Sequence, residues 1–384
     1  MTPRTQRPTV HWQDGMKIRQ QHFVQTENAW LERVRDAWAG SITPFNYGLL
    51  PVAEGDTALD LRVSVSDTRQ IVVQLLACQA VSSGGARIDF RDERTPLRAT
   101  YQLSSDEPTL FEVILSVNPF VRVPTGEPDP EEVPVRHPNT QPTYQLLIVP
   151  TDQLSVTELG NYHLSVGRVR ALGHEVKLSD SYLPPCATVS AHPSLQRWYD
   201  TLTDQLVQTA GHARQVVQKI KVKSESQSLT TNLREWAERI TYQVAEHLDA
   251  YRMVIPHQPP VHLVVFYVRL ARVLKTCLLC MSDSGKEEML RYLHEWSDTH
   301  PGTLEAVINS TVELTYDHHD LYASLDTIHT LMDTLATLMA KLAALDYIGK
   351  ESRETAPPPP APRPSVFVKE DPDQGKRKSS FWNI

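Results

Sequence analysis

The sequence has little cysteine and no long hydrophobic stretch, and both shortages narrow the possible functions. Four cysteines occur in 384 residues, at positions 78, 186, 277 and 280. So few cannot form a dense disulfide framework, which favours a reducing compartment. The longest apolar run, residues 261–268, is interrupted by His262, whereas a membrane-spanning helix needs roughly 20 apolar residues. The charged N-terminus is not followed by the apolar segment of a secretory signal. We therefore expect a soluble, cytoplasmic protein.

The chain also lacks a strong charge of one sign and the common catalytic motifs. It carries 38 basic and 46 acidic residues, a net charge of -8, so no overall field attracts nucleic acid or an anionic membrane. Neither G-x-G-x-x-G, a P-loop, G-x-S-x-G nor H-E-x-x-H occurs. We expect protein partners, no nucleic acid, no cofactor, and no catalytic activity.

Two short motifs resemble reactive or metal sites. Cys277 and Cys280 have C-x-x-C spacing but fall late in an apolar segment, which favours packing over redox chemistry. Residues 316–320 (YDHHD) hold several metal-binding side chains, but adjacent side chains point in different directions. Asp320 is better explained as the cap of a helix that begins at Leu321. We assign no metal ligand, and a hydrolase or metalloenzyme remains the alternative from another class.

The first half of the chain shows the alternation typical of strands. Apolar residues alternate or run together in several short segments separated by turn residues: 59–66, 71–76, 111–117, 144–149 and 162–170. One helix is expected from about residue 20 to 38. We predict an α+β protein whose residues 1–188 form a β-sandwich-like domain.

Residues 119–142 interrupt this pattern. They contain seven prolines and an acidic patch at 127–132. Because proline has no amide donor, this segment cannot be a central strand. We predict a long extended arm, which can contact a partner or a neighbouring copy.

The second half changes to helical spacing. Residues 189–349 are predicted to form a helical bundle, with Pro193 at or near the first turn of its first helix. The last helix repeats apolar residues at steps of four and three, the a and d positions of a heptad. We predict that this seam holds a trimer together through Leu321, Leu325, Ile328, Met332, Leu335, Met339 and Leu342. An amphipathic helix within a single-chain bundle is the alternative.

Residues 350–384 begin as a proline-rich spacer and end in a basic and aromatic peptide. We predict a flexible tail whose end is a tethered ligand, although a dispensable terminus is the alternative. The predicted anchor residues are Lys376, Arg377, Lys378, Phe381, Trp382 and Ile384.

Several blocks resemble a known family in the same order. They are residues 10–16 (VHWQDGM), 20–23 (QQHF), 44–49 (PFNYGL), 160–169 (GNYHLSVGRV), 182–186 (YLPPC) and 192–195 (HPSL). Together they are similar to the TssK family, the baseplate proteins of type VI secretion systems. The resemblance covers residues 10 to 200 in motifs and extends to about 348 in architecture.

This resemblance implies a homotrimer with a β-rich shoulder and a helical neck. The shoulder would bind TssF/TssG-like wedge proteins, and we expect the contact at Trp12, His22, Phe23, Phe45 and Tyr47. Family members also have a C-terminal head that docks on the envelope complex of TssJ, TssL and TssM. We expect this chain to lack the head and to use its tail as the envelope anchor, as a structural adaptor at the inner face of the envelope. A phage-tail-like receptor-binding or tail-fibre adaptor is the alternative function.

Overall fold

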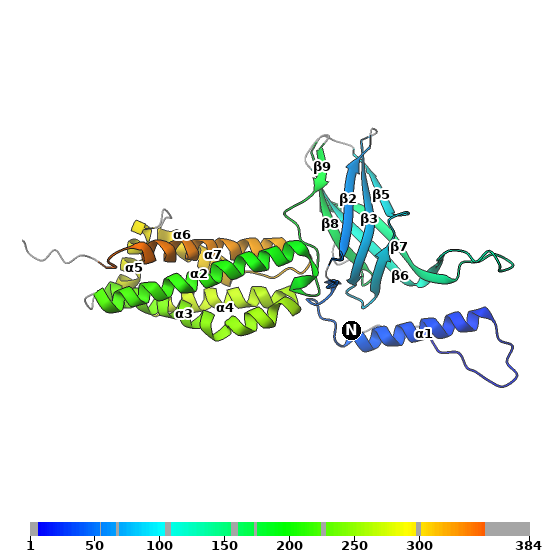
Figure 1. Cartoon of the computed structure of the whole chain (residues 1–384), viewed down its shortest axis with the longest axis horizontal. Helices are drawn as coiled ribbons and strands as arrows, with labels where there is room; N and C mark the ends of the chain where they lie inside the picture. Colours follow the sequence, from blue (N-terminus) through cyan, green and yellow to red (C-terminus); the bar gives the residue numbers. More distant parts are fainter. Residues whose placement is uncertain are drawn as a thin grey trace, which may run out of the picture. The chain divides into compact units, whose positions relative to one another are not determined.

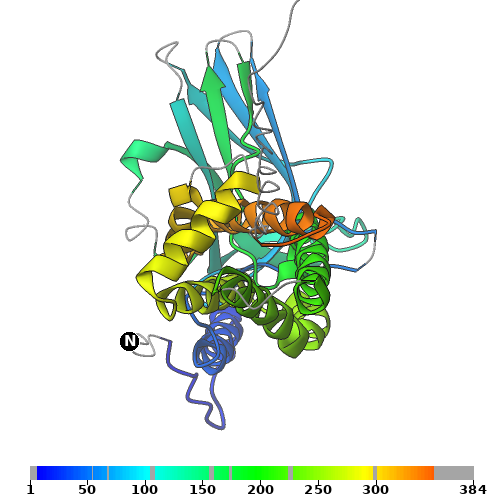
Figure 2. The same ribbon diagram turned by 90° about the vertical axis from the view of Figure 1, so that its left-hand side faces the viewer.

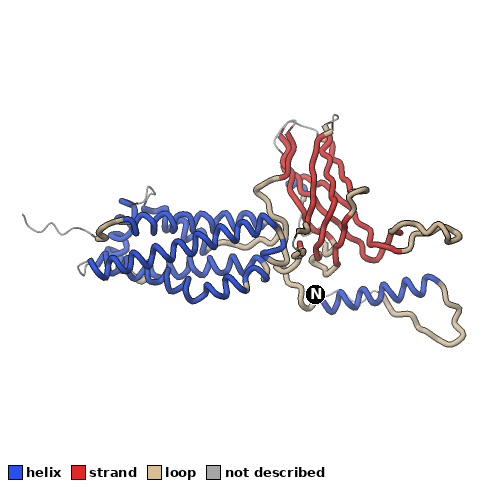
Figure 3. The backbone as a smooth tube through the Cα atoms, in the orientation of Figure 1, coloured by secondary structure: helices blue, strands red, loops and turns tan. Residues whose placement is uncertain are grey.

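Strands build the first half of the chain and helices build the second half (Figure 1, Figure 3). The computed structural model describes residues 7–53, 55–66, 69–103, 109–154, 160–172, 175–223, 228–296 and 301–349. Met1–Ile348 is one compact unit. The predicted α+β class is confirmed. The division at residue 188 stays a prediction, because contacts join both halves within this unit.

Two antiparallel sheets form the β-rich half. The first contains β1 (Gly48–Leu49), β2 (Leu59–Val65), β3 (Gln70–Val81), β4 (Arg87–Arg91) and β5 (Leu97–Gln102), with β3 at its centre. The second has the order β7-β6-β8-β9 and consists of β6 (Thr109–Thr125), β7 (Asn139–Pro150), β8 (His163–Leu172) and β9 (Glu175–Leu178).

Side chains at alternate positions of the strands fill the space between the two sheets. Ile71, Val73 and Leu75 of β3 are buried at every second position, and so are Val113 and Leu115 of β6. This two-residue period is what a pleated strand requires when one face meets a core.

The arm is a continuation of two strands. Beyond Val117, β6 pairs with β7 alone, through a register shift between Asn118 and Arg122, as far as the pair Thr125–Asn139. Prolines are tolerated there because the ribbon has no third strand that needs their amides. The arm of residues 119–142 is thus a hairpin, whereas the sequence predicted only a long extended arm that is not a central strand.

The helical half is a bundle, and Figure 2 views it from the helical side. Its helices are α2 (Pro193–Lys223), α3 (Ser228–Met253), α4 (Pro260–Leu279), α5 (Asp283–Trp296), α6 (Pro301–Val312) and α7 (Leu321–Ala344). Helix α2 begins at Pro193, which agrees with the predicted place of this proline at or near the first helical turn. None of the helices in the described residues is long and apolar enough to span a membrane.

The predicted trimer seam lies inside this bundle. All seven of its residues are at most 1% exposed in the single chain: Leu321, Leu325, Ile328, Met332, Leu335, Met339 and Leu342. Helix α7 packs most extensively on α2 and also contacts α4, α5 and α6. The heptad is therefore filled by helices of the same chain, and its assignment as an intermolecular contact is corrected. The periodicity is the same in both cases, so the sequence could not distinguish them.

Candidate protein-binding surface

Helix α1 (Gln20–Ala39) turns its polar side toward its own chain. Ala29 and Glu32 are buried, and Glu32 accepts a hydrogen bond of 2.8 Å from the backbone amide of Arg7. Arg35 donates a hydrogen bond to the phenol of Tyr162. Arg122 of the arm bonds Glu27 and Asn28. Polar contacts therefore hold α1 against the β-rich half.

The opposite side of α1 faces solvent and carries large apolar side chains, with the carboxylate of Glu27 among them. Five of its exposed side chains form a helix stripe: Val24, Trp30, Leu31, Val34 and Trp38. Trp30 is 57% and Trp38 is 62% exposed. Steps of three, four and seven residues place these side chains on one side of a helix. A surface helix normally buries its apolar side, so this reversed arrangement makes the helix stripe a candidate surface for another protein.

Three predicted partner residues gather where α1 begins. The Trp12 ring lies 6.1 Å from His22 and 6.3 Å from Phe23, measured between ring centroids. Trp12 and Phe23 are exposed, and His22 is half-buried. The His22 side chain also accepts a hydrogen bond of 3.2 Å from the backbone amide of Arg19, which caps the helix. The helix start thus presents an exposed aromatic cluster.

Phe45 and Tyr47 lie elsewhere, where the β-rich half meets the loop before α7. Phe45 is exposed and contacts Tyr316 with ring centroids 5.7 Å apart. Tyr47 is only 4% exposed and packs against His318 at 4.6 Å. Tyr47 is therefore a packing residue, and its prediction as an exposed anchor is corrected.

His318 links the two halves at this point. One ring nitrogen, Nε2, lies 2.9 Å from the Tyr47 carbonyl, and Nδ1 lies 2.7 Å from the Tyr316 hydroxyl. A neutral ring satisfies both contacts, because Nε2–H donates to the carbonyl and Nδ1 accepts from the hydroxyl. Burial lowers the pKa of His318 to about 4. The predicted metal-like cluster is therefore a hydrogen-bonded junction.

Arg168 of β8 makes a second link between the halves. Its guanidinium donates to Glu112 of β6 at 3.1 Å and to Asp320 at 2.9 Å. It also lies 4.6 Å above the Tyr182 ring. Asp320 accepts from the Tyr322 amide and caps α7, which confirms the predicted role of this residue.

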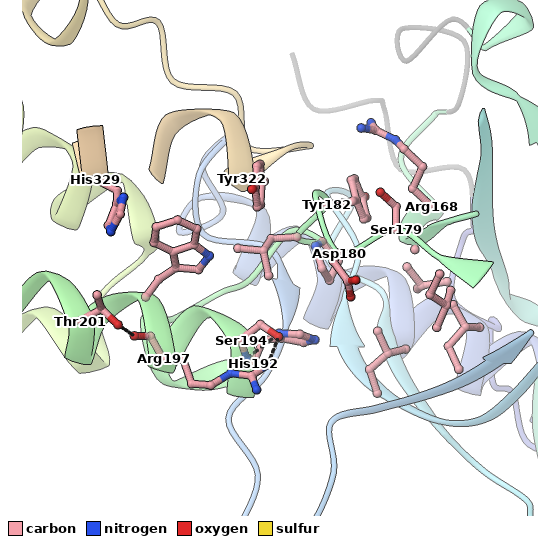
Figure 4. Close-up of a pocket in the computed structure, with 18 residues that line it drawn as sticks. Arg168, Ser179, Asp180, Tyr182, His192, Ser194, Arg197, Thr201, Tyr322 and His329 are labelled. Carbon is pink, nitrogen blue, oxygen red and sulfur yellow. Dashed lines mark hydrogen bonds between the residues drawn. The ribbon is translucent and has the colours of Figure 1, made fainter. Parts of the chain in front are cut away.

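A cavity of about 540 Å³ lies beside this link (Figure 4). Arg168 and Tyr182 line one part of it, and His192, Ser194 and Arg197 line another near the start of α2. His192 accepts a hydrogen bond from the Ser194 amide, and the Ser194 hydroxyl accepts one from Arg197. These bonds cap a helix and do not prepare a serine for nucleophilic attack.

Of the cysteine pair, Cys277 packs against the core and Cys280 does not. Cys277 is half-buried and Cys280, the C-cap of α4, is exposed, so the packing interpretation was wrong for Cys280. Among the described residues, no group of three His, Cys, Asp or Glu side chains could hold a metal ion. The predicted tail anchor of Lys376, Arg377, Lys378, Phe381, Trp382 and Ile384 lies outside the described residues.

The sequence matches one family model. Residues 144–348, more than half of the chain, match the family described as "Bacterial Type VI secretion, VC_A0110, EvfL, ImpJ, VasE". No curated protein matches the sequence.

Solved structures with similar architecture carry the name TssK or that of its assembly. A crystal structure of TssK shares 18% identity, with a TM-score of 0.53 over 85% of this chain and 69% of that one. The TssK–TssF–TssG baseplate subcomplex shares 17% identity, with a TM-score of 0.44 over 88% of this chain and 98% of that one. The baseplate complex of a type VI secretion system shares 15% identity, with a TM-score of 0.49 over 90% of this chain and 71% of that one. At 18% identity and a TM-score of 0.53, the crystal structure of TssK indicates a shared fold.

Proposed function

This chain belongs to the bacterial type VI secretion family that includes ImpJ and VasE, and we propose that it is a structural protein of the secretion baseplate. The family match over residues 144–348 carries this proposal. The fold shared with TssK supports it. In this role the chain connects other proteins and catalyses no reaction.

The proposed partners are TssF/TssG-like proteins. A similar protein, TssK, is named together with TssF and TssG in a baseplate subcomplex. The surface proposed for this contact is the aromatic cluster of Trp12, His22 and Phe23, with exposed Phe45 as a further contact. Exposed aromatic side chains, which lose their contact with water when a partner binds, are common anchors of protein interfaces.

The chain acts in this proposal as a cytoplasmic homotrimer at the inner face of the envelope. The tail, residues 350–384, connects the baseplate to an envelope partner through its basic and aromatic end. Three tails on one trimer would bind together, so each single contact can be weak. The trimer needs contact surfaces other than the buried α7 heptad.

Co-purification tests the role and the surface together. Co-expressed TssF/TssG-like proteins should be retained by the parent chain and lost with the double variant Trp12→Ala, Phe23→Ala. Leu279→Ala, which removes another exposed apolar side chain on α4, is the matched control and should retain both proteins. Failure of the parent chain to retain either protein contradicts the baseplate role. Equal retention by parent and double variant contradicts only the surface.

A further inference from the structure

A groove in the helical bundle holds both cysteines of the C-x-x-C motif. The groove is lined by α3 and α4, has a volume of about 620 Å³, and includes Cys277 and Cys280 in its lining. Cys277 is half-buried and Cys280 is exposed. The other two cysteines of the chain, Cys78 and Cys186, are fully buried. The groove thus makes one pair of thiols accessible to a solute, while the remaining thiols are shielded.

Three arginines make this groove positively charged. Arg239 of α3 and Arg269 and Arg272 of α4 line it, and all three are exposed. Within the described residues, none of these side chains forms an ion pair. Glu235 supplies a single carboxylate to the lining, so positive charge predominates. Guanidinium groups with free donors bind carboxylates, which favours an anionic occupant.

The spacing along both helices places the arginines and the thiols on one surface. Steps of three and four residues put side chains on the same side of a helix. The lining follows these steps on each helix: Asn232, Glu235, Arg239 and Gln243 on α3, and Arg269, Arg272, Thr276 and Cys280 on α4. A molecule bound by the arginines therefore lies along the surface that carries the thiols.

The two thiols differ in their surroundings. Burial raises the pKa of Cys277, and Arg239 partly offsets this shift. Cys280 is exposed at the C-cap of α4, so an incoming molecule reaches it first. The carbonyl end of a helix disfavours a thiolate, and the arginines of the groove supply the positive charge that opposes this effect. Cys280 is thus suited to attack, and Cys277 is suited to react second.

Helix geometry permits a bond between the two cysteines. Side chains three residues apart on a helix have Cβ atoms about 5–6 Å apart, and a disulfide joins Cα atoms up to about 7 Å apart. Helix α4 ends at Leu279, so Cys280 can adjust its backbone without breaking the interior of the helix.

We propose that Cys277 and Cys280 form a reversible thiol–disulfide site for an anionic low-molecular-weight disulfide. The arginines bind its carboxylates, and the Cys280 thiolate attacks one of its sulfur atoms. A mixed disulfide forms, the original S–S bond breaks, and one thiolate leaves. The Cys277 thiolate then attacks the Cys280 sulfur, the Cys277–Cys280 bond forms, and the second thiolate leaves. The pair loses two electrons, and the small disulfide becomes two thiols, which take up the two protons.

Reaction of the full chain with glutathione disulfide, which is anionic, tests the site. Peptide mass spectrometry locates the modified cysteines. The parent should gain the Cys277–Cys280 bond and keep Cys78 and Cys186 as free thiols. Cys277→Ser should stop at the mixed disulfide with Cys280, and Cys280→Ser should form neither product. An added dithiol reductant should restore both thiols of the parent.

Charge reversal tests the arginines. Arg239→Glu with Arg272→Glu should slow the reaction with glutathione disulfide about tenfold at low ionic strength and speed that with the cationic disulfide cystamine. Added salt should weaken both effects. Arg214→Glu with Arg252→Glu changes two exposed arginines outside the groove, so this matched control should react like the parent. Circular dichroism verifies folding. Should the first variant unfold, Arg239→Gln with Arg272→Gln replaces it.

Any of four results overturns the proposal. They are a parent whose Cys277 and Cys280 stay free, a mixed disulfide that persists at Cys280 of the parent, a Cys280→Ser variant that reacts like the parent, and a charge-reversed variant with the parent's preference between the two disulfides. The site does not depend on the baseplate role, which retention of TssF/TssG-like proteins tests separately.

Discussion

Arg168 on β8 donates a hydrogen bond of 2.9 Å to Asp320, the residue that caps α7. The two residues are 152 positions apart in the sequence. Glu112 accepts from the same guanidinium at 3.1 Å, so one side chain connects two strands and a helix start. Both halves of the chain therefore share an ion pair that is largely removed from water.

Replacement of Arg168 should destabilise the protein. Arg168→Met leaves the carboxylate of Glu112 buried without its cation, which costs about 3 kcal/mol in the free energy of unfolding. Urea denaturation measures this loss. Arg170→Met, an exposed position on the same strand, is the control and should change stability by less than about 0.5 kcal/mol. Adding Glu112→Gln to Arg168→Met should recover part of the loss. Equal stability of both arginine variants would refute the role of this link.

Stability should fall below neutral pH because of His318. Its pKa is lowered by burial to about 4, compared with about 6.5 in an unfolded chain. The unfolded chain therefore binds the proton first as the pH falls, and the stability contributed by neutral His318 is lost between pH 6.5 and 4. The same direction holds for His192, whose pKa burial also lowers to about 4. We expect a loss of about 1–3 kcal/mol per histidine across this window.

The matched variant is His318→Gln, whose amide can still donate to the Tyr47 carbonyl but does not titrate. Urea denaturation at several pH values should give a flatter dependence of unfolding free energy on pH than in the parent. His262→Gln changes an exposed histidine of α4, and it should keep the slope of the parent. An unchanged slope in His318→Gln contradicts the prediction.

The α7 heptad should behave as the core of a single chain. Leu335→Ala removes a fully buried side chain and should cost about 2–5 kcal/mol. Thr337→Ala on the exposed side of the same helix should be nearly neutral. The loss at Leu335 should be the same over a hundredfold range of protein concentration, as denaturation curves can measure. A smaller loss of unfolding free energy at high protein concentration would instead indicate that the heptad is a contact between copies.

Deletion of residues 355–384 should separate anchoring from assembly. The shortened chain should keep its oligomeric state and retain TssF/TssG-like proteins, but its baseplates should no longer gather at the envelope. Fluorescence microscopy of a labelled baseplate protein measures this position in cells. Replacing Phe381 and Trp382 with serine in the full chain should have the same effect if the aromatic end is the ligand. Normal position and secretion after deletion would show that the tail is dispensable.

Local patterns in the sequence predicted most elements of the fold. Alternation in residues 59–66 predicted β2, and the helical spacing after Pro193 predicted the bundle. Strand β4 escaped prediction although Ile88 and Phe90 alternate with charged residues, because a five-residue run between turns gives little signal. Strand β9 is shorter still.

The site was harder to predict because it depends on which side of an element meets its own chain. Helix α1 was expected from the sequence, and Phe23 was singled out. The exposure of Trp30, Val34 and Trp38 was missed, because apolar residues on one side of a helix normally indicate the buried side. The α7 heptad shows the opposite error: its residues were expected at a contact between copies, but they are buried within one chain. In both cases the periodicity was correct, and only tertiary contacts decided what covers it.

The hydrogen bonds around Leu49 have a consequence for engineering. Its amide donates to the Pro185 carbonyl, and its own carbonyl accepts from the Ala187 amide, both at 2.8 Å. Gly48, with φ of +109°, permits this close approach, because a Cβ there would lie 2.1 Å from the Pro185 oxygen. The chain thus enters the two sheets and leaves them at adjacent points, about one strand spacing apart. Another sandwich with neighbouring ends could therefore join the chain at the same two points, but it would also have to supply the contact that Arg168 makes with Asp320 at the start of α7.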